Sequence, residues 1–405
     1  MENYTALIIL VAIALGILDL LTDRWQKLQQ QLFPLALLVL YSLFIILYYY
    51  GPDIWTYVPY YEKICTPLQL MANPKQSAQF EFGYGMFCSL FHLTGLSYWW
   101  LTVAIKTLYF LALWLLLRQL PKRQIFALSC IVMTDVNLIM HETRQCLAVS
   151  FFILMVLLMQ NRKYLWAVLC AVVAVSVHKS GFMPVGLTLM GVLLYRTRQY
   201  SAIYMLLILA LMALIALPVQ RISASILAFL PLPSDYIISL KHHLQLGRQF
   251  QTIAIIYLAL LLAFNLYLSY DRKSRYSWIA FTVLAGMGIV VLLYPYYFLL
   301  VRMRSYFVPF IVFYLVKVMS DEQRSMAIPY SSLIKQTLMV LILVYYTHLA
   351  LSLERGARTL RAPVYRACTV FELRNASQKQ IRDRQLNIAH KYWTQDYMKK
   401  ENNKL

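Results

Sequence analysis

Apolar runs long enough to cross a lipid bilayer recur along most of the 405-residue chain. A spanning helix needs about 20 apolar residues, because each residue advances only about 1.5 Å through a hydrocarbon layer roughly 30 Å thick. Backbone amides in that layer must be satisfied within the chain, which favours helices. We predict twelve spans, at about residues 5–21, 32–50, 98–117, 125–140, 145–160, 164–177, 181–195, 200–217, 251–270, 276–294, 303–319 and 336–353. The sequence therefore predicts an all-α, polytopic integral membrane protein.

The composition excludes a soluble globular protein. Hydrophobic residues make up 61% of the chain and charged residues only 13%, whereas soluble domains are about 45–50% apolar and about 25% charged. The net charge is +20, which in so apolar a chain indicates basic loops beside a membrane and not a nucleic-acid partner. The six cysteines form no Cys-x-x-Cys motif and no cluster with histidine. We therefore expect no disulfide framework, no metal site and no cofactor.

Short basic loops predict how the bundle is oriented. Twelve Lys and Arg residues lie in five loops: Arg24/Lys27, Arg118/Lys122/Arg123, Arg162/Lys163, Arg196/Arg198 and Arg272/Lys273/Arg275. All five loops fall on one side if segment 81–96 does not cross the membrane, and the positive-inside rule makes that side cytoplasmic. Segment 81–96 is weakly apolar and contains Glu81. We predict a re-entrant or surface helix there, with an ordinary short span as the alternative, and an N-terminus outside.

The same topology predicts the domain organisation. Residues 1–353 form a transmembrane helical domain, and loops 51–80 and 218–250 lie on its outer face. Residues 354–405 form a basic C-terminal tail with twelve Lys and Arg residues and five acidic ones. The span count places this tail outside although its charge favours the cytoplasm, so its side stays open.

Polar clusters interrupt the apolar pattern at the predicted outer face. They are Asp53 with Tyr57 and Tyr60; Glu81 with Gly83 and Tyr84; His141-Glu142-Thr143-Arg144-Gln145; His178-Lys179-Ser180; and Arg302-Met303-Arg304-Ser305-Tyr306. Polar groups at the edge of a bilayer are costly and usually functional. We therefore expect a ligand site on this face.

The residue types indicate the chemistry of that ligand. Four cations stand where the positive-inside rule disfavours them: Arg144, Lys179, Arg302 and Arg304. A guanidinium matches two phosphate oxygens at once, so a pyrophosphate at the lipid head-group level is a natural partner. The candidate proton acceptors for a hydroxyl are Asp53, Glu81, Glu142 and His178. The outer-face tyrosines could stack on sugars, or could belong to an interfacial aromatic belt.

Two charges lie inside predicted spans. Lys106 lies midway along 98–117 and Asp135 midway along 125–140. In a helical hairpin they sit at one depth, and an unpaired charge there is costly. We predict that they pair inside the bundle; a proton or ion relay is the alternative.

The order of these motifs resembles the EpsG family of polytopic bacterial membrane proteins, which is similar to the Wzy-type polysaccharide polymerases. The resemblance covers about residues 1–310. It rests on Asp53 followed by Tyr57 and Tyr60, Glu81-Phe82-Gly83-Tyr84, Arg144-Gln145 opening one span, His178-Lys179-Ser180-Gly181 opening another, and Arg302 and Arg304 before Tyr306-Phe307.

The resemblance implies an enzyme of the bacterial inner membrane with its active site facing the periplasm or exterior. Such an enzyme joins repeat units linked to undecaprenyl pyrophosphate into O-antigen, capsule or exopolysaccharide, and is similar to the metal-independent, all-helical GT-C glycosyltransferases. Together with the residue types, the resemblance suggests pyrophosphate binding by Arg144, Arg302 and Arg304, with Lys179 assisting. His178 or Glu142 is the candidate base, ahead of Asp53 and Glu81. Tyr57, Tyr60 and Tyr84 are expected to contact sugar or carrier lipid, and a chain-length regulator could act alongside.

Two other function classes stay open. A lipid-linked oligosaccharide flippase would account for the buried charges Lys106 and Asp135, although the chain has only 12 glycines and no visible repeat. A membrane O-acyltransferase acting on polysaccharide would need a placed histidine, for which His178 or the pair His242-His243 could serve.

Overall fold

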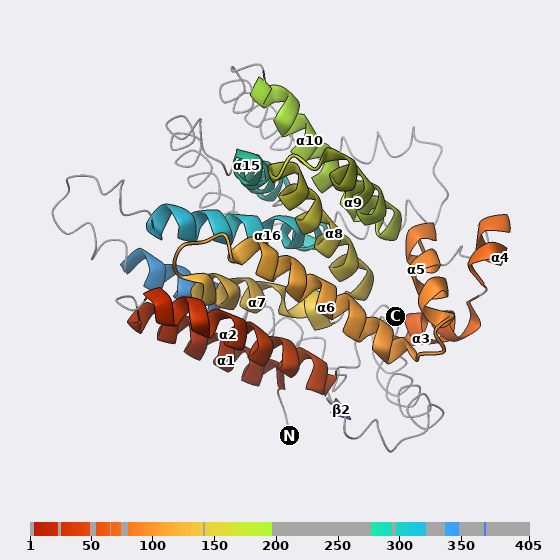
Figure 1. Cartoon of the computed structure of the whole chain (residues 1–405), viewed down its shortest axis with the longest axis horizontal. Coiled ribbons are helices and arrows are strands. Elements are labelled where there is room, and N and C mark those ends of the chain that lie inside the picture. Colours follow the sequence, from red (N-terminus) through yellow and green to blue (C-terminus); the bar gives the residue numbers. More distant parts are fainter. Residues whose placement is uncertain are drawn as a thin grey trace, which may run out of the picture. The chain divides into compact units, whose positions relative to one another are not determined.

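The computed structural model (Figure 1) describes residues 4–22, 26–48, 54–64, 66–73, 80–140, 142–196, 277–293, 297–320, 337–347 and 368–369. Two predicted spans, 200–217 and 251–270, lie outside the described residues. The predicted outer loop 218–250, Asp53 and most of the C-terminal tail lie outside them as well.

Ten helices occur where spans are predicted. They are α1 (Tyr4–Leu21), α2 (Gln26–Ile46), α6 (Tyr98–Leu117), α7 (Gln124–Met140), α8 (Thr143–Gln160), α9 (Tyr164–Val177), α10 (Phe182–Arg196), α15 (Ser277–Leu293), α16 (Tyr297–Ser320) and the helix Thr337–Thr347. Four described segments are long and apolar enough to cross a membrane: Lys27–Ile46, Tyr98–Leu117, Thr143–Gln160 and Arg302–Ser320. The structure is thus that of a helical membrane protein, and the total of twelve spans stays a prediction.

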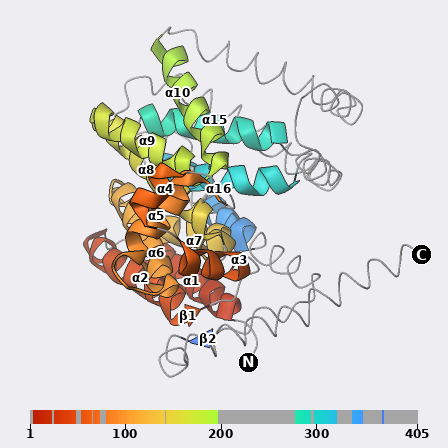
Figure 2. The same cartoon turned by 90° about the vertical axis from the view of Figure 1, so that its right-hand side faces the viewer.

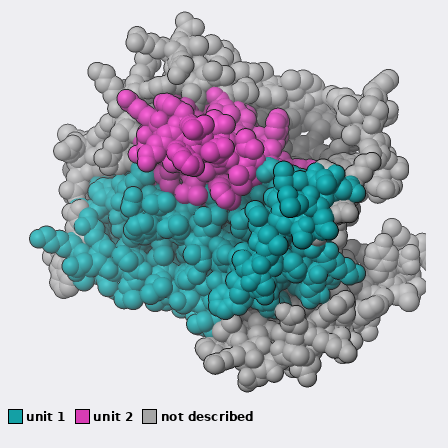
Figure 3. All heavy atoms as spheres, turned by 45° about the vertical axis from the view of Figure 1, so that its right-hand side comes forward, with its two compact units in different colours: residues 1–150, 176–178, 315–405 teal, residues 151–175, 179–314 magenta. Residues whose placement is uncertain are grey.

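The chain divides into two compact units, shown in teal and magenta in Figure 3. Unit 1 comprises Met1–Ser150, Ser176–His178 and Leu315–Leu405. Unit 2 comprises Phe151–Val175 and Lys179–Tyr314. Each is described by itself below.

Helix α7 forms the core of unit 1. Nearly every residue of α7 is buried, and the helix packs against α1, α2 and α6, as both views show (Figures 1 and 2). A helix that is apolar on all sides is expected in such a central position. Gly16 of α1 permits a close contact beside α7, since a Cβ there would lie 3.1 Å from Leu343 Cδ1. The sequence pattern and the packing therefore agree for this helix.

Polar side chains in unit 1 satisfy backbone groups at helix ends. The Asp19 carboxylate accepts from the backbone N–H of Phe126 in the first turn of α7 at 2.8 Å. The Asp19 carbonyl accepts from Gln29 Nε2 at 2.9 Å and from Arg123 Nη1 at 2.5 Å. Buried backbone groups need such partners, so Asp19, for which the sequence suggests no role, joins α1, α2 and the start of α7.

The two buried charges have partners in the bundle. Lys106 Nζ donates to the carbonyl of Phe44 at 2.9 Å, in the last turn of α2, and Tyr109 donates its hydroxyl proton to Asp135 at 2.7 Å. A cation is favourable beside the unsatisfied carbonyls of a helix C-terminus. The prediction that Lys106 and Asp135 pair with each other stays a prediction.

Unit 2 contains an aromatic core and a close helix contact. The ring of Phe152 in α8 packs edge-on against the rings of Tyr306, Phe307 and Phe310 in α16. Helix α15 lies beside α10 (Figure 2). At Gly286 a Cβ would meet the Phe307 ring at 2.5 Å, so glycine permits the close contact between α15 and α16.

The described part of the predicted outer loop 51–80 contains two short helices. They are α3 (Ile54–Lys63) and α4 (Pro67–Ala72), and α4 begins with a capping box formed by Thr66 and Gln69. The weakly apolar segment that follows forms α5 (Phe82–His92). Its 11 residues extend roughly 16 Å, about half of the hydrocarbon thickness. This length suits a helix that does not cross.

One small feature departs from the all-α prediction. Strands β1 (Leu47–Tyr48) and β2 (Cys368–Thr369) pair antiparallel, with Leu47 opposite Thr369 and Tyr48 opposite Cys368. Strand β1 directly follows α2, at the opposite end from the basic residues Arg24 and Lys27. The pairing therefore joins part of the basic tail to the end of α2 that the charge pattern predicts to be outside.

We expect Cys368 to react with a membrane-impermeant maleimide that is added to intact cells. The experiment uses a C65S background, because Cys65 is the other cysteine that lies neither in a predicted span nor in segment 81–96. The reason is that β2 pairs with the strand that follows α2, at the end of α2 that the charge pattern predicts to be outside. A second variant that carries K163C, in the loop predicted to be cytoplasmic, together with C65S and C368S should be labelled only after permeabilisation. Labelling of Cys368 only after permeabilisation would contradict this placement of the tail.

Candidate functional site

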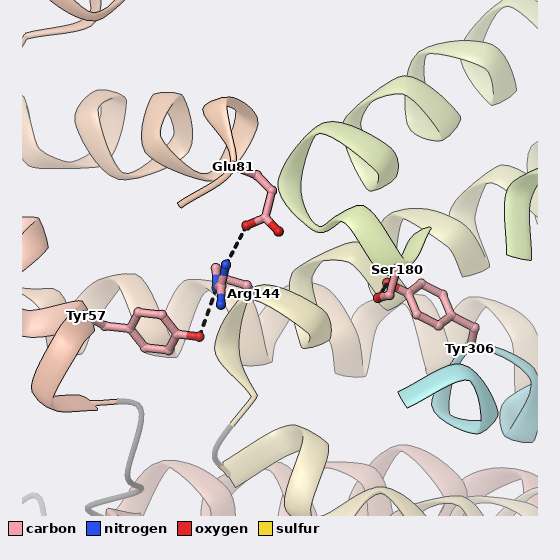
Figure 4. A network of polar contacts seen from close by, with 5 residues as sticks. All are labelled: Tyr57, Glu81, Arg144, Ser180 and Tyr306. Carbon is pink, nitrogen blue, oxygen red and sulfur yellow. Dashed lines mark hydrogen bonds and ion pairs between the residues drawn. The ribbon is translucent and has the colours of Figure 1, made fainter. Parts of the chain in front are cut away.

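Arg144 is the centre of the polar cluster in unit 1 (Figure 4). It lies in the first turn of α8. Its Nη1 donates to Glu81 Oε2 at 2.5 Å, and its Nε donates to the Tyr57 hydroxyl at 2.9 Å. The side chain of Arg144 is 21% exposed and that of Glu81 is 12% exposed. One guanidinium thus joins α3, the start of α5 and α8, and the side chain that carries it is partly exposed.

Aromatic rings surround this guanidinium. Its central carbon lies 4.5 Å from the ring centre of Phe80 and 5.4 Å from that of Tyr57. A ring face attracts a cation, most strongly where water is excluded. Phe80 also packs against Tyr60 at 4.7 Å and against Tyr84 at 5.8 Å between ring centres. The rings fix the plane of the guanidinium as well as its position.

The three tyrosines predicted to contact sugar or carrier are buried in this cluster. Tyr57 is 3% exposed, Tyr60 9% and Tyr84 0%. In this structure each of them packs against Phe80, Tyr57 also packs against Tyr84, and Tyr57 accepts a hydrogen bond from Arg144. Their contact with a sugar stays a prediction. Their observed role is to pack around Phe80, which lies against the cation.

Glu81 occupies the N-cap position of α5 but does not cap the helix. Its backbone is extended, and its side chain makes no hydrogen bond to the first turn. A carboxylate at this position commonly accepts from the backbone N–H groups of the first turn. Here the carboxylate is directed to Arg144 instead.

Gly83 sets how closely α5 approaches the end of α9. A Cβ at this position would lie 2.6 Å from the carbonyl carbon of Ser176, which is closer than real Cβ atoms come. Ser176 stands two residues before His178, and His178 is 8% exposed. Both belong to unit 1, so the Gly83 contact brings the start of α5, and with it Glu81, near the chain segment that carries His178.

Two further hydrogen bonds hold the surrounding elements. The Tyr61 hydroxyl donates to the carbonyl of Leu96 at 2.7 Å, which fixes α3 to the turn after α5. Burial raises the pKa of Tyr61 to about 12, so the phenol stays protonated and can donate. Tyr98 donates to the Thr143 hydroxyl at 3.4 Å and ties α6 to the first turn of α8, beside Arg144.

The other candidate bases have different positions. Glu142 is half-buried and directly precedes α8. His178 is buried at the end of α9, and Asp53 lies outside the described residues. Glu81 is the candidate for which the structure shows an ion pair with Arg144.

A second cluster lies in unit 2. Lys179 and Ser180 form a short 3-10 turn, Lys179–Gly181, between α9 and α10. The Ser180 hydroxyl lies 3.0 Å from the Tyr306 hydroxyl of α16, within hydrogen-bonding distance (Figure 4). Gly181 permits this tight turn, because a Cβ there would lie 2.8 Å from the carbonyl oxygen of Ala174.

The two late arginines are part of α16, whereas the sequence placed Arg302 just before its span. Arg302 and Tyr306 are four residues apart and share one face of the helix, whereas Arg302 and Arg304 do not. Arg302 is half-buried. Arg304 is 9% exposed, and its Nε is buried without a hydrogen-bond partner. The two side chains therefore leave the helix in different directions.

Sequence reasoning missed several residues of these clusters. They are Phe80 under the guanidinium, Tyr98 beside Thr143, Ser176 against Gly83, and the Ser180–Tyr306 contact. Phe80 directly precedes the motif Glu81-Phe82-Gly83-Tyr84, so its place beside that motif could have indicated its role. The others depend on contacts between distant segments. Among the described residues, no three His, Cys, Asp or Glu side chains lie close enough together to hold a metal ion.

We expect G83A to lower the melting temperature of the detergent-solubilised protein, because the added methyl group would press on the Ser176 backbone. Overpacking of this kind typically costs about 1–3 kcal/mol. G186A in α10 is the matched control, since a Cβ there meets nothing within 4 Å and alanine favours a helix by roughly 0.5–1 kcal/mol. Equal melting temperatures for the two variants would contradict the close contact at Gly83.

The comparisons with known proteins agree with the motif resemblance. Residues 3–354 match the model of a family described as the EpsG family. The match covers both clusters and ends where the basic tail begins. No curated protein and no solved structure matches the chain.

Proposed function

Because the chain belongs to the EpsG family, we propose that it is a polysaccharide polymerase that joins lipid-linked oligosaccharide repeat units. In this proposal the carrier is undecaprenyl pyrophosphate, and the product is an O-antigen, a capsule or an exopolysaccharide. The reaction takes place on the outer face of the bacterial inner membrane, where a chain-length regulator could act alongside.

The observation that carries the proposal is the setting of Arg144. A cation in the first turn of an apolar helix is costly in free energy, and such residues in membrane proteins are usually functional. Here it is held by Tyr57 and Glu81 and lies over Phe80, yet it remains 21% exposed. This is the setting expected of a guanidinium that neighbouring side chains hold in position for a phosphate ligand.

The proposed reaction transfers a glycan from its carrier to a hydroxyl of a second lipid-linked repeat unit. The acceptor oxygen forms a bond to the anomeric carbon of the donor sugar and gives its proton to a base. The bond between that carbon and the pyrophosphate oxygen breaks, and its electron pair stays with the carrier pyrophosphate. Fixed cations can stabilise this growing negative charge, so we assign the enzyme to the metal-independent, GT-C-like glycosyltransferases.

We assign roles to the remaining site residues by position. Arg302 shares a helix face with Tyr306, whose hydroxyl contacts Ser180 beside Lys179, and we propose Arg302 and Lys179 as further phosphate contacts. Arg304 is the more deeply buried arginine, and its unsatisfied Nε keeps it a candidate for the same ligand. His178 or Glu142 is the proposed base, with Asp53 and Glu81 as alternatives.

Purified protein with lipid-linked repeat units alone distinguishes the three function classes. A polymerase makes long chains without a nucleotide sugar, an acyl donor or an ion gradient. A flippase moves the units without joining them, and an O-acyltransferase needs an acyl donor. The hydrogen bonds of Lys106 and Asp135 inside the bundle suit a structural role as well as a transport role.

We expect R144A to lower polymer formation by about 100-fold or more, the usual effect of removing one donor from a developing negative charge. Single repeat units should persist. R144K should restore little, because an ammonium cannot make the two parallel bonds. K163A, which removes an exposed cation in the loop between α8 and α9, is the control. Normal chain-length ladders from R144A would contradict the proposed phosphate contact.

We expect R302A and R304A to differ. R302A removes a half-buried side chain and should shorten the polymer ladder without changing the melting temperature. R304A removes a side chain that is only 9% exposed and should lower the melting temperature as well, because a packed side chain leaves a cavity. A normal ladder from a well-folded R302A variant would exclude Arg302 as a phosphate contact.

A further inference from the structure

We infer that Glu81 competes with the carrier pyrophosphate for Arg144, so that breaking and re-forming the Glu81–Arg144 ion pair accompanies each binding and release of the carrier. This inference rests on the proposed function, since it assumes that Arg144 contacts the pyrophosphate. It assigns Glu81 the role of a positioning residue that keeps Arg144 in place between turnovers.

The positions of Tyr57 and Glu81 imply that a phosphate and Glu81 would share one nitrogen atom of Arg144. Glu81 Oε2 lies 2.5 Å from Arg144 Nη1, and Tyr57 accepts from Nε on the same guanidinium. With Nε donating to Tyr57, a phosphate that binds through two parallel hydrogen bonds would use Nη1 and Nη2, and Glu81 already accepts from Nη1. Tyr57 and the ring of Phe80 can hold the guanidinium during this exchange, because neither contact involves Nη1.

The charges lead to the same conclusion. Arg144 and Glu81 together are neutral, and the two side chains are only 21% and 12% exposed. An anion that approaches Arg144 meets the Glu81 carboxylate at close range, in a setting where water screens the repulsion weakly. The carboxylate must therefore move aside when the phosphate binds.

The Glu81 carboxylate has another possible hydrogen-bond partner when it leaves Arg144. Glu81 stands at the N-cap of α5, and its side chain makes no hydrogen bond to the first turn of that helix. A carboxylate there can accept from first-turn N–H groups, and the helix N-terminus favours its negative charge. The displaced side chain thus has an alternative partner within reach of its own rotatable bonds.

The exchange also accounts for product release. After transfer, the carrier pyrophosphate keeps the electron pair of the broken bond and carries more negative charge than before. It would bind a lone arginine more tightly than the substrate does and would leave slowly. The return of Glu81 to Arg144 replaces the phosphate as the anionic partner and lets the carrier depart.

The test is the binding of undecaprenyl pyrophosphate to full-length protein in zwitterionic nanodiscs. A partly exposed ion pair is worth on the order of 1 kcal/mol, so its removal in E81Q should tighten binding roughly fivefold. Polymer turnover should fall in the same variant, with stronger inhibition by added undecaprenyl pyrophosphate. Undecaprenyl monophosphate and inorganic pyrophosphate, tested in parallel, show whether the lipid or the phosphate groups are recognised.

The controls separate this competition from other effects. E62Q removes one exposed carboxylate from α3 and should not tighten binding, which excludes a general effect of net charge. Y57F removes the neutral partner of Arg144 and should weaken binding. E81A repeats the removal of charge without an amide, should E81Q fail to fold.

The outcomes distinguish this inference from the proposed function. If R144A loses binding but E81Q binds as the wild type does or more weakly, Glu81 is a structural support for Arg144 and the competition is overturned. If R144A binds undecaprenyl pyrophosphate as tightly as the wild type, Arg144 is not the phosphate contact, and the proposed function loses its main support together with this inference.

Discussion

The ion pair between Arg144 and Glu81 is the interaction on which the packing of α3 and α5 in unit 1 depends. A cation in the first turn of an apolar helix must be paired or hydrogen-bonded, because an isolated charge there is costly. Its partners come from α3 and from the start of α5, neither of which is a predicted span. The need to satisfy one guanidinium thus fixes two short helices against the bundle and assembles the aromatic rings around the cation.

The same rule governs the interior. Asp19 satisfies the first turn of α7, Lys106 a carbonyl in the last turn of α2, and Tyr109 donates to Asp135. Each of these contacts accordingly gives a buried polar group a partner in a low-dielectric setting. These contacts join α1, α2, α6 and α7 at defined points. Apolar packing is not directional, so it would not by itself fix how these helices align. The packing at Gly16 and Gly83 then sets how near two helices come.

Much of the fold follows from the sequence, because the length of an apolar run and the backbone's need for internal hydrogen bonds are local properties. The predicted bounds of α1, α6 and α9 agree with the structure to within one residue. The prediction was less accurate at two helix starts, since α2 and α16 each begin six residues earlier than predicted. The first residues of α2 are mostly Gln, which lowers the hydropathy of a window but still forms helix readily. The first six residues of α16 are mostly apolar, so polarity does not explain its earlier start. The short helices α3 and α4 were missed because neither is long enough to appear as a membrane span.

The sequence by itself determined that the chain is a helical membrane protein of the EpsG family, and it named Tyr57, Glu81 and Arg144 as site residues. Only the tertiary structure decided that these three side chains form one cluster, that Phe80 lies beneath the cation, and that Arg302 and Arg304 leave α16 in different directions. The physical reason is the range of the interactions. Hydropathy and motif spacing are properties of the local sequence. The partner of a charge depends instead on which distant segments pack together. Burial makes that partner necessary, because an unpaired buried charge is costly.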